Sequence, residues 1–320
     1  MNHFSKKSIS MALVLFVIGI LPGFAQNYHY QKIAGWSNLT NSKIQNFLES
    51  TVTMKQRKVA VFDCDGTLFG QCPHYLADEA LYDYAVRTYK GKKDANSIAK
   101  MKIVDQLLHG NNVGVEYVKN RIRFLSGTTS EKIQNIGYDM FKEKYQNKFY
   151  PQMKTLLSNL RNFGFEIWII SASPELLYQR FCCEQLGVSE DRMLGVRSLI
   201  KADGTVTDQL VYPVPQDEGK AEVVNTFIKA QPLFAAGNSR GDMEMMNTSV
   251  GLKLILNPDN TKKEAAFGGK TCKEYWAADP NCVTEYVRDV PENDYKYVCD
   301  QLGVKKNAVS SVSAPEVVTY

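Results

Sequence analysis

The sequence predicts an α/β protein with a parallel sheet core and an inserted α-helical cap. Short apolar runs alternate with amphipathic helical patterns along much of the 320-residue chain, which is typical of parallel strands covered by helices on both faces. Residues 70–149 interrupt this alternation with a helical pattern rich in tyrosine, lysine and asparagine. Hydrophobic residues make up 44% of the chain and charged residues 22%, a balance that excludes a disordered or fibrous protein.

The first 25 residues are predicted to be a signal peptide. Two lysines precede an uncharged apolar run over residues 9–21, which is shorter than the roughly 20 residues that span a bilayer. Residues 23–25 read Gly-Phe-Ala and place small residues where a signal peptidase cleaves, so cleavage is expected before Gln26. The alternative is an uncleaved membrane anchor. The prediction is a secreted or periplasmic protein that has no membrane association after cleavage.

The core is expected over residues 26–69 and 150–270. Serine, proline and glutamate at residues 173–175 are typical of a helix start with Ser173 as the N-cap, and Gly187 is expected to end that helix. The other boundaries follow from hydrophobic periodicity. Strands are predicted at residues 58–62, 165–170, 196–200, 232–236 and 252–256, and helices at 41–54, 153–163, 174–186 and 219–230.

The insert over residues 70–149 begins directly after the first strand. It therefore starts at the carboxyl edge of the sheet, where open α/β sheets bind their ligands, and is predicted to be a lid.

The C-terminal part is expected to comprise a cysteine-containing extension over residues 271–304 and a disordered tail over residues 305–320. Seven cysteines are present, and an oxidising compartment permits disulfides. Because the number is odd, at least one thiol is free or pairs between chains, and Cys64 is the expected one. A disulfide between two of Cys272, Cys282 and Cys299 could stabilise the extension.

The strongest chemical signal is Asp-Cys-Asp-Gly-Thr at residues 63–67, immediately after the first strand. Two acids this close repel each other unless a cation lies between them. The alternative is a simple Asp-Gly turn. Three further signals follow other predicted elements: Ser171 at a strand end, Lys220 at a helix start, and Gly-Asn-Ser-Arg-Gly-Asp at residues 237–242.

These four motifs, in this order, resemble those of the haloacid dehalogenase (HAD) superfamily of phosphatases. The resemblance covers about residues 58–260 and implies the HAD fold, with a Rossmann-like parallel sheet. The cap lies between the first and second motifs, as in the phosphoserine phosphatase and phosphorylcholine phosphatase branch.

The resemblance also implies roles for individual residues. Asp63 would attack phosphorus and form an aspartyl-phosphate, and Asp65 would be the general acid and base. Ser171 and Lys220 would bind the phosphoryl oxygens. A Mg²⁺ ion would be held by Asp63, the main-chain carbonyl of Asp65, and Asn238 or Asp242 from the fourth motif.

Two departures affect the expected metal site and substrate. The fourth motif often opens with an aspartate where Asn238 stands, which predicts weaker magnesium binding. Phosphoserine phosphatases have an acid nine residues after the nucleophile, and that position is Cys72 here.

The lid also carries several tyrosines together with Asp78 and Glu79, a composition that could bind the quaternary ammonium of phosphocholine. Tyr75, Tyr82 and Tyr89 recur every seven residues, however, which places them on one helix face and favours packing in the core of the cap.

The predicted function is hydrolysis of a small phosphomonoester of the phosphoserine or phosphocholine type. The alternatives are a phosphotransferase or phosphomutase on the same fold, and an exported binding module without catalysis. A dehalogenase is disfavoured because dehalogenation needs no second aspartate such as Asp65. The formal net charge of +4, from 38 basic and 34 acidic residues, indicates no nucleic-acid partner.

Overall fold

The computed structural model describes residues 28–110, 114–289 and 295–307. The predicted signal peptide and most of the predicted tail therefore lie outside the described residues. The core is a seven-stranded sheet in the order β4-β3-β2-β1-β5-β6-β9, parallel throughout except for the antiparallel pair β3 and β4. The strands are β1 (Val59–Phe62), β2 (Glu166–Pro174), β3 (Met193–Ile200), β4 (Val206–Val211), β5 (Phe234–Gly237), β6 (Leu252–Leu256) and β9 (Cys282–Glu285).

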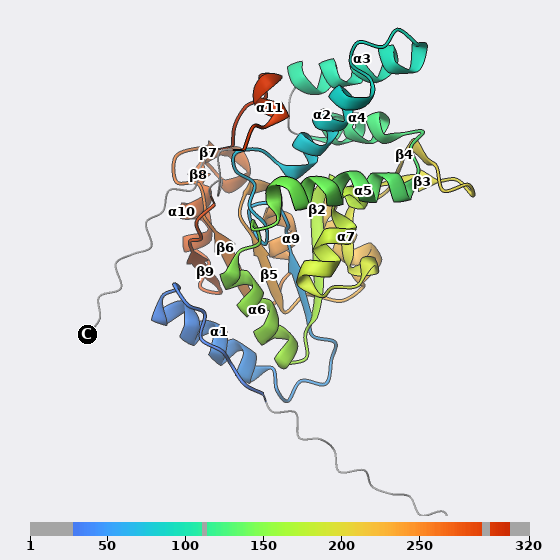
Figure 1. Ribbon diagram of the computed structural model, residues 1–320. Helices are drawn as coiled ribbons and strands as arrows, with labels where there is room; N and C mark the ends of the chain where they lie inside the picture. Colours follow the sequence, from blue (N-terminus) through green and yellow to red (C-terminus); the bar gives the residue numbers. More distant parts are fainter. Residues whose placement is uncertain (1–27, 111–113, 290–294, 308–320) are drawn as a thin grey trace, which may run out of the picture.

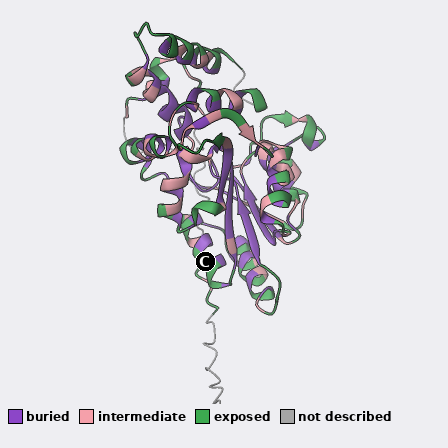
Figure 2. Ribbon diagram, turned by 90° about the vertical axis from the view of Figure 1, so that its right-hand side faces the viewer, coloured by how far each residue is buried: buried purple, intermediate pink, exposed green. Residues whose placement is uncertain are grey.

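Both faces of this sheet are buried (Figure 2). Successive side chains of a strand point to opposite faces. In β1, Ala60 and Phe62 accordingly belong to one apolar cluster, whereas Val59 and Val61 belong to another. This is why the strand is a continuous apolar run and does not alternate with polar residues.

Helices cover each face. The first cluster includes residues of α1 (Asn38–Ser50), α6 (Pro151–Asn162) and α7 (Glu175–Leu186). The second includes residues of α8 (Glu218–Val223) with the π-helical turn Val224–Ile228 that continues it, α9 (Met243–Asn247) and α10 (Cys272–Ala277). A short hairpin of β7 (Lys263–Glu264) and β8 (Lys270–Thr271) precedes α10. The predicted α/β class is confirmed.

The insert forms a helical cap above the end of the sheet at which β1 finishes (Figure 1). Its elements are α2 (Leu76–Thr88), α3 (Ala95–His109), α4 (Val115–Leu125), α5 (Ser130–Met140) and the π-helical turn Phe141–Tyr145. The loop between α4 and α5 is bonded to the core, because the Gly127 amide donates to the Val206 carbonyl (2.9 Å) and the Val206 amide donates to the Thr128 carbonyl (3.0 Å).

The C-terminal extension takes part in both the sheet and the cap. Strand β9 pairs with β6 and forms one edge of the sheet, and the short helix α11 (Val298–Gln301) packs against α2. Cys272, Cys282 and Cys299 are all free thiols. The bridge considered among the C-terminal cysteines is therefore not formed, and Cys64 lies against Cys182 with the sulfur atoms 3.8 Å apart.

The start of α7 differs from the prediction. Strand β2 continues through Ser173 to Pro174, and α7 begins at Glu175 with Pro174 in the N-cap position. Ser173 does not cap the helix, because its hydroxyl donates to Asp65. Gly187 ends α7 with φ 60° as predicted. Within the described ranges, we find no helix with the length and apolar character needed to cross a membrane.

Candidate active site

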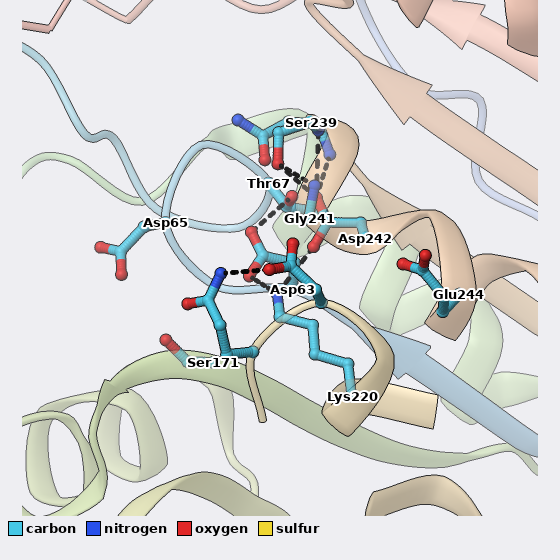
Figure 3. Close-up of polar contacts among 12 residues, drawn as sticks. Asp63, Asp65, Thr67, Ser171, Lys220, Ser239, Gly241, Asp242 and Glu244 are labelled. Atoms are coloured by element: carbon cyan, nitrogen blue, oxygen red, sulfur yellow. Dashed lines mark hydrogen bonds and ion pairs between the residues drawn. The ribbon is translucent and has the colours of Figure 1, made fainter. Parts of the chain in front are cut away.

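The site is built at the carboxyl end of β1, where Asp63 follows the strand (Figure 3). The Asp63 amide donates to the Ala236 carbonyl of the neighbouring strand (3.0 Å). Its carboxylate is buried and accepts hydrogen bonds at both oxygens, from Lys220 Nζ at 2.6 Å and from the Thr67 hydroxyl at 3.0 Å. Strand pairing and these two side chains therefore hold Asp63 in one orientation.

The loop after Asp63 turns sharply at Gly66. Its φ is 85°, in the left-handed region that glycine adopts without steric cost. A Cβ atom on Gly66 would lie 2.0 Å from the side-chain nitrogen of Asn238. Glycine is therefore required both for the turn and for the close approach of Asn238 to the first motif.

Asp242 organises the loop of the fourth motif. One carboxylate oxygen accepts from Lys220 Nζ (2.7 Å). The other accepts from the amides of Asn238 and Ser239 (3.0 Å each) and from the Ser239 hydroxyl (3.2 Å). Asp242 thus fixes both the lysine and the loop that presents Asn238.

The electrostatics of this cluster depend on burial. Burial and the neighbouring Asp242 raise the pKa of Asp63 to about 7, although Lys220 opposes the shift. Burial by itself would lower the pKa of Lys220, but Asp242 and Asp63 reverse this and hold it above its ordinary value. Lys220 is therefore a permanent cation between two carboxylates.

Asp65 lies in a different environment from Asp63. Its two carboxylate oxygens accept hydrogen bonds from the Tyr178 hydroxyl (2.8 Å) and the Ser173 hydroxyl (2.9 Å). Burial raises the pKa of Asp65 to about 6, and the bonds from Tyr178 and Ser173 limit the rise. A carboxyl group that titrates near neutrality is suited to both giving and accepting a proton.

Ser171 lies in β2 and is buried. Its hydroxyl oxygen accepts from the Ser173 amide at 3.1 Å. This contact uses the oxygen as an acceptor, so the hydroxyl hydrogen remains able to donate to a bound anion.

The oxygen atoms at this strand end suit a magnesium ion, which prefers hard oxygen ligands. The Asp63 carboxylate, the main-chain carbonyl of Asp65 and the side-chain amide of Asn238 are of this kind. Asp63 and Asp242 flank Lys220, and the Asp65 carboxylate lies to one side (Figure 3), so a cation would balance the excess negative charge. Across the described ranges no three His, Cys, Asp or Glu side chains form a metal-binding group, so the carbonyl and the amide would be essential. Both carboxylate oxygens of Asp242 already accept hydrogen bonds from Lys220 and from the loop of the fourth motif. Direct binding of the metal by Asp242 therefore stays a prediction.

The structure thus arranges the six predicted site residues in two groups, one of four residues and one of two. Asp63, Lys220 and Asp242 form a continuous ion-paired group, whose Asp242 also bonds the Asn238 amide. Ser171 joins Asp65 through Ser173 in a second group. Figure 3 shows Asp65 to one side of the first group.

The sequence did not indicate that Thr67, Ser173 and Tyr178 belong to the site. Thr67 belongs to the first motif, four residues after Asp63, so its position in the sequence could have indicated its contact with Asp63. Ser173 was interpreted as a helix cap, because serine before proline is typical of that position. Tyr178 lies in a helix with no motif around it, and only the fold brings it to Asp65.

The two lid acids considered for phosphocholine binding, Asp78 and Glu79, are already neutralised by cations. Asp78 accepts from Arg121 at 2.6 Å, and Glu79 accepts from Lys144 at 2.6 Å. Neither is an unpaired acid facing a ligand, so the acidic part of the proposed phosphocholine recognition is not supported.

Comparison with known proteins places the chain in a family. Residues 60–247, more than half of the chain, match the haloacid dehalogenase-like hydrolases. A structure of a protein of unknown function from Anaerococcus prevotii shares 15% identity, covering 71% of this chain and 87% of that one, with a TM-score of 0.52. One from Bordetella pertussis, also of unknown function, shares 15% identity, covering 64% and 92%, with a TM-score of 0.52.

A substrate-bound phosphoserine phosphatase shares 19% identity, covering 72% of this chain and 93% of that one, with a TM-score of 0.44. The comparison with curated proteins yields no match. The two structures with the higher TM-scores support the fold described above.

Proposed function

This chain belongs to the haloacid dehalogenase-like hydrolase family, and we propose that it is a magnesium-dependent phosphomonoester hydrolase that acts through an aspartyl-phosphate. The observation that carries the proposal is the pair Asp63 and Asp65. One carboxylate is fixed by Lys220 and Thr67, and the other, two residues later, is fixed by hydroxyl groups and titrates near neutrality.

In the first step an Asp63 oxygen forms a bond to phosphorus as the bond from phosphorus to the ester oxygen breaks. Asp65 gives its proton to the departing alkoxide. Lys220 and Ser171 bind the phosphoryl oxygens through charge and a hydrogen bond. A magnesium ion, when bound, supplies positive charge between the Asp63 carboxylate and the anionic substrate.

In the second step a water molecule gives a proton to Asp65 and attacks the aspartyl-phosphate. The bond between Asp63 and phosphorus breaks, so the carboxylate and inorganic phosphate are released. The same group is the acid in the first step and the base in the second, which requires a pKa near the working pH.

The substrate proposed is small, because the cap stands over the strand ends that carry the site (Figure 1). Phosphoserine and phosphocholine are the first esters to test. Cys72 occupies the position of the expected substrate-binding acid, and it is buried. Phosphocholine recognition would have to use the tyrosines of the lid alone, because Asp78 and Glu79 are paired.

The proposed compartment is the periplasm or the exterior of the cell. Its support is the composition of the first 25 residues. Sequencing the N-terminus of the protein recovered from expressing cells should find Gln26 first. An intact N-terminal methionine would contradict export by cleavage.

The proposed activity is tested by measuring phosphate release from a panel of phosphomonoesters, with magnesium and with excess EDTA. We expect release that depends on magnesium and is abolished in Asp63→Asn, which keeps the shape of the side chain. Full activity in EDTA would contradict the metal requirement, and no release from any ester would contradict the hydrolase.

A further inference from the structure

We propose that Tyr178 is a positioning residue that fixes the carboxylate of Asp65 and joins it to the first helix of the cap. The inference rests on the proposed function for the role of Asp65. It adds a direct hydrogen-bonded link between the cap and the group that transfers the proton.

The hydroxyl of Tyr178 is hydrogen-bonded to Asp65 and to Ala77, and it also lies beside the Ser173 hydroxyl. It donates to Asp65 Oδ1 at 2.8 Å, and it accepts from the main-chain amide of Ala77, in the first turn of α2, at 3.2 Å. An amide N–H only donates, and a phenol has a single hydrogen. The direction of both bonds is therefore fixed, and the one hydrogen of Tyr178 is directed to Asp65.

The hydrogen bond from the Ala77 amide satisfies one of the N–H groups at the start of α2. The first four N–H groups of an α-helix have no partner within the helix. The residue before α2, Tyr75, provides no side-chain cap. Tyr178, which comes from α7 in the core, therefore takes the place of a capping residue for the first helix of the cap.

The ring of Tyr178 is held firmly. It is fully buried, its centroid lies 5.2 Å from that of Phe181 and 6.5 Å from that of Phe69, and such packing leaves a side chain little freedom. The hydroxyl cannot follow α2 if that helix moves. A displacement of the cap would thus remove one partner of Tyr178 without moving the ring.

The second bond to Asp65 completes the arrangement. Ser173 donates to Oδ2 at 2.9 Å, so each carboxylate oxygen is held by one hydroxyl. An ionised carboxylate offers about four lone-pair sites, and two remain for the proton that is transferred. Tyr178 and Ser173 together fix the plane of the carboxylate and leave it able to react.

A general acid matters most when the leaving group is a poor one. Loss of the Tyr178 hydroxyl should therefore slow the first step for an alkyl ester much more than for p-nitrophenyl phosphate, whose phenolate departs without a proton. The ratio kcat/KM reports this step for both esters. A purely structural role of Tyr178 would lower both values alike.

The experiment compares Tyr178→Phe with the matched variant Tyr145→Phe. Tyr145 is also a fully buried tyrosine, at the end of the last turn of the cap, and its hydroxyl donates to the His74 carbonyl at 3.0 Å. Each variant is assayed with p-nitrophenyl phosphate and with the best alkyl ester of the panel. Hydrogen exchange of the peptide that contains Ala77 is measured in parallel.

For Tyr178→Phe we expect kcat/KM for the alkyl ester to fall about tenfold or more, which is a part of the roughly 10²–10⁴-fold that general acid–base catalysis contributes. The value for the aryl ester should change less than about threefold, as should both values for Tyr145→Phe. Exchange at Ala77 should be faster in Tyr178→Phe alone.

Equal losses on the two esters, or no loss, would overturn the positioning role, and unchanged exchange at Ala77 would overturn the link to the cap. An inactive parent would refute the proposed function, and the positioning role with it. The exchange measurement would then still decide the link to the cap, so the two failures are distinguishable.

Discussion

At the scale of single residues, the site gives different surroundings to two aspartates that are only two positions apart in the sequence. Asp63 contacts a cation and a hydroxyl, whereas the Asp65 carboxylate accepts hydrogen bonds from two neutral hydroxyls. Burial and Asp242 raise the pKa of Asp63 to about 7, and the adjacent Lys220 opposes this rise and so favours the anion that a nucleophile requires. Burial raises the pKa of Asp65 to about 6, so this group can carry a proton near neutral pH, as a general acid requires. The different partners thus support different roles.

We predict that Asp65→Asn lowers kcat by about 10²–10⁴-fold, the usual contribution of general acid and base catalysis. The amide has the same shape but transfers no proton. Phosphate release should be measured beside Asp203→Asn, an aspartate in an exposed turn, which should behave as the parent. An Asp65→Asn enzyme within about tenfold of the parent would contradict the assignment.

A second prediction concerns Asn238, which supplies an amide where a carboxylate is expected. Asn238→Asp adds a negative charge beside the ion and should lower the magnesium concentration at half-maximal activity, because affinity in oxygen sites rises with ligand charge. Calorimetric titration of magnesium gives a readout independent of turnover. An unchanged midpoint in both measurements would show that Asn238 only shapes the loop.

At the scale of elements, hydrophobic runs were sufficient to predict the central strands. Buried parallel strands such as β1 and β6 are continuous apolar segments, and their sequence has few other interpretations. Strand β4 was missed because its residues are largely half-exposed or exposed and its pairing with β3 is antiparallel. Strand β9 was missed because it has four residues and alternates in burial.

The site was predicted as far as its residues belong to motifs. Asp63, Lys220 and Asp242 meet because strand and helix ends gather at one edge of a parallel sheet. Tyr178 meets Asp65 across more than 100 positions of the chain, and no local pattern carries that information. Strand β2 was predicted to end at residue 170 but ends at Pro174, and α7 begins one residue later than predicted, because the contact of Ser173 with Asp65 is tertiary and overrides its capping preference.

The turn of the first motif gives a third prediction, with Gly66→Ala compared with Gly164→Ala. Both glycines have a positive φ, 85° and 82°, so each substitution incurs a similar backbone cost of about 1–2 kcal/mol. A Cβ atom on Gly164 meets no atom within 4 Å, whereas one on Gly66 would displace Asn238.

We therefore expect Gly164→Ala to lower the free energy of unfolding with full activity in the folded protein. Gly66→Ala should in addition lose most activity and magnesium affinity. Urea denaturation, phosphate release and magnesium titration measure these effects. Equal activity of the two variants would show that the contact between Gly66 and Asn238 is unimportant.

At the scale of the whole molecule, the C-terminal extension forms polar contacts with both the core and the cap. Glu285, at the end of β9, accepts from the amide and hydroxyl of Ser37 at the start of α1 (3.1 and 2.9 Å). Asp289 pairs with Lys148 at the base of the cap (2.5 Å). The extension therefore contacts the core and the cap through buried polar groups, although it was predicted from composition only as a separate segment.

Glu79 is more deeply buried than Glu285 and Asp289, and it also contacts the C-terminal extension. Its carboxylate, which is not exposed to solvent, accepts from Lys144 Nζ (2.6 Å) and from the amides of Val298 and Cys299 (2.7 and 2.9 Å). It thus joins α2 and the π-helical turn of the cap to the start of α11. Both amides belong to the first turn of α11, where N–H groups need an acceptor.

We predict that Glu79→Gln lowers the free energy of unfolding by about 3–5 kcal/mol, because it leaves the Lys144 ammonium buried without its counter-charge. Urea denaturation should be compared with Glu143→Gln, in which the half-exposed partner of Arg87 is changed and the expected loss is about 0–1 kcal/mol. Limited proteolysis should cut residues 295–304 faster in Glu79→Gln, because α11 loses its contact with Glu79.

Adding Lys144→Met to the Glu79→Gln protein should restore part of the stability, since the unpaired charge is removed. A Glu79→Gln protein as stable as Glu143→Gln, with an equally resistant C-terminal segment, would show that this ion pair does not hold the extension to the cap.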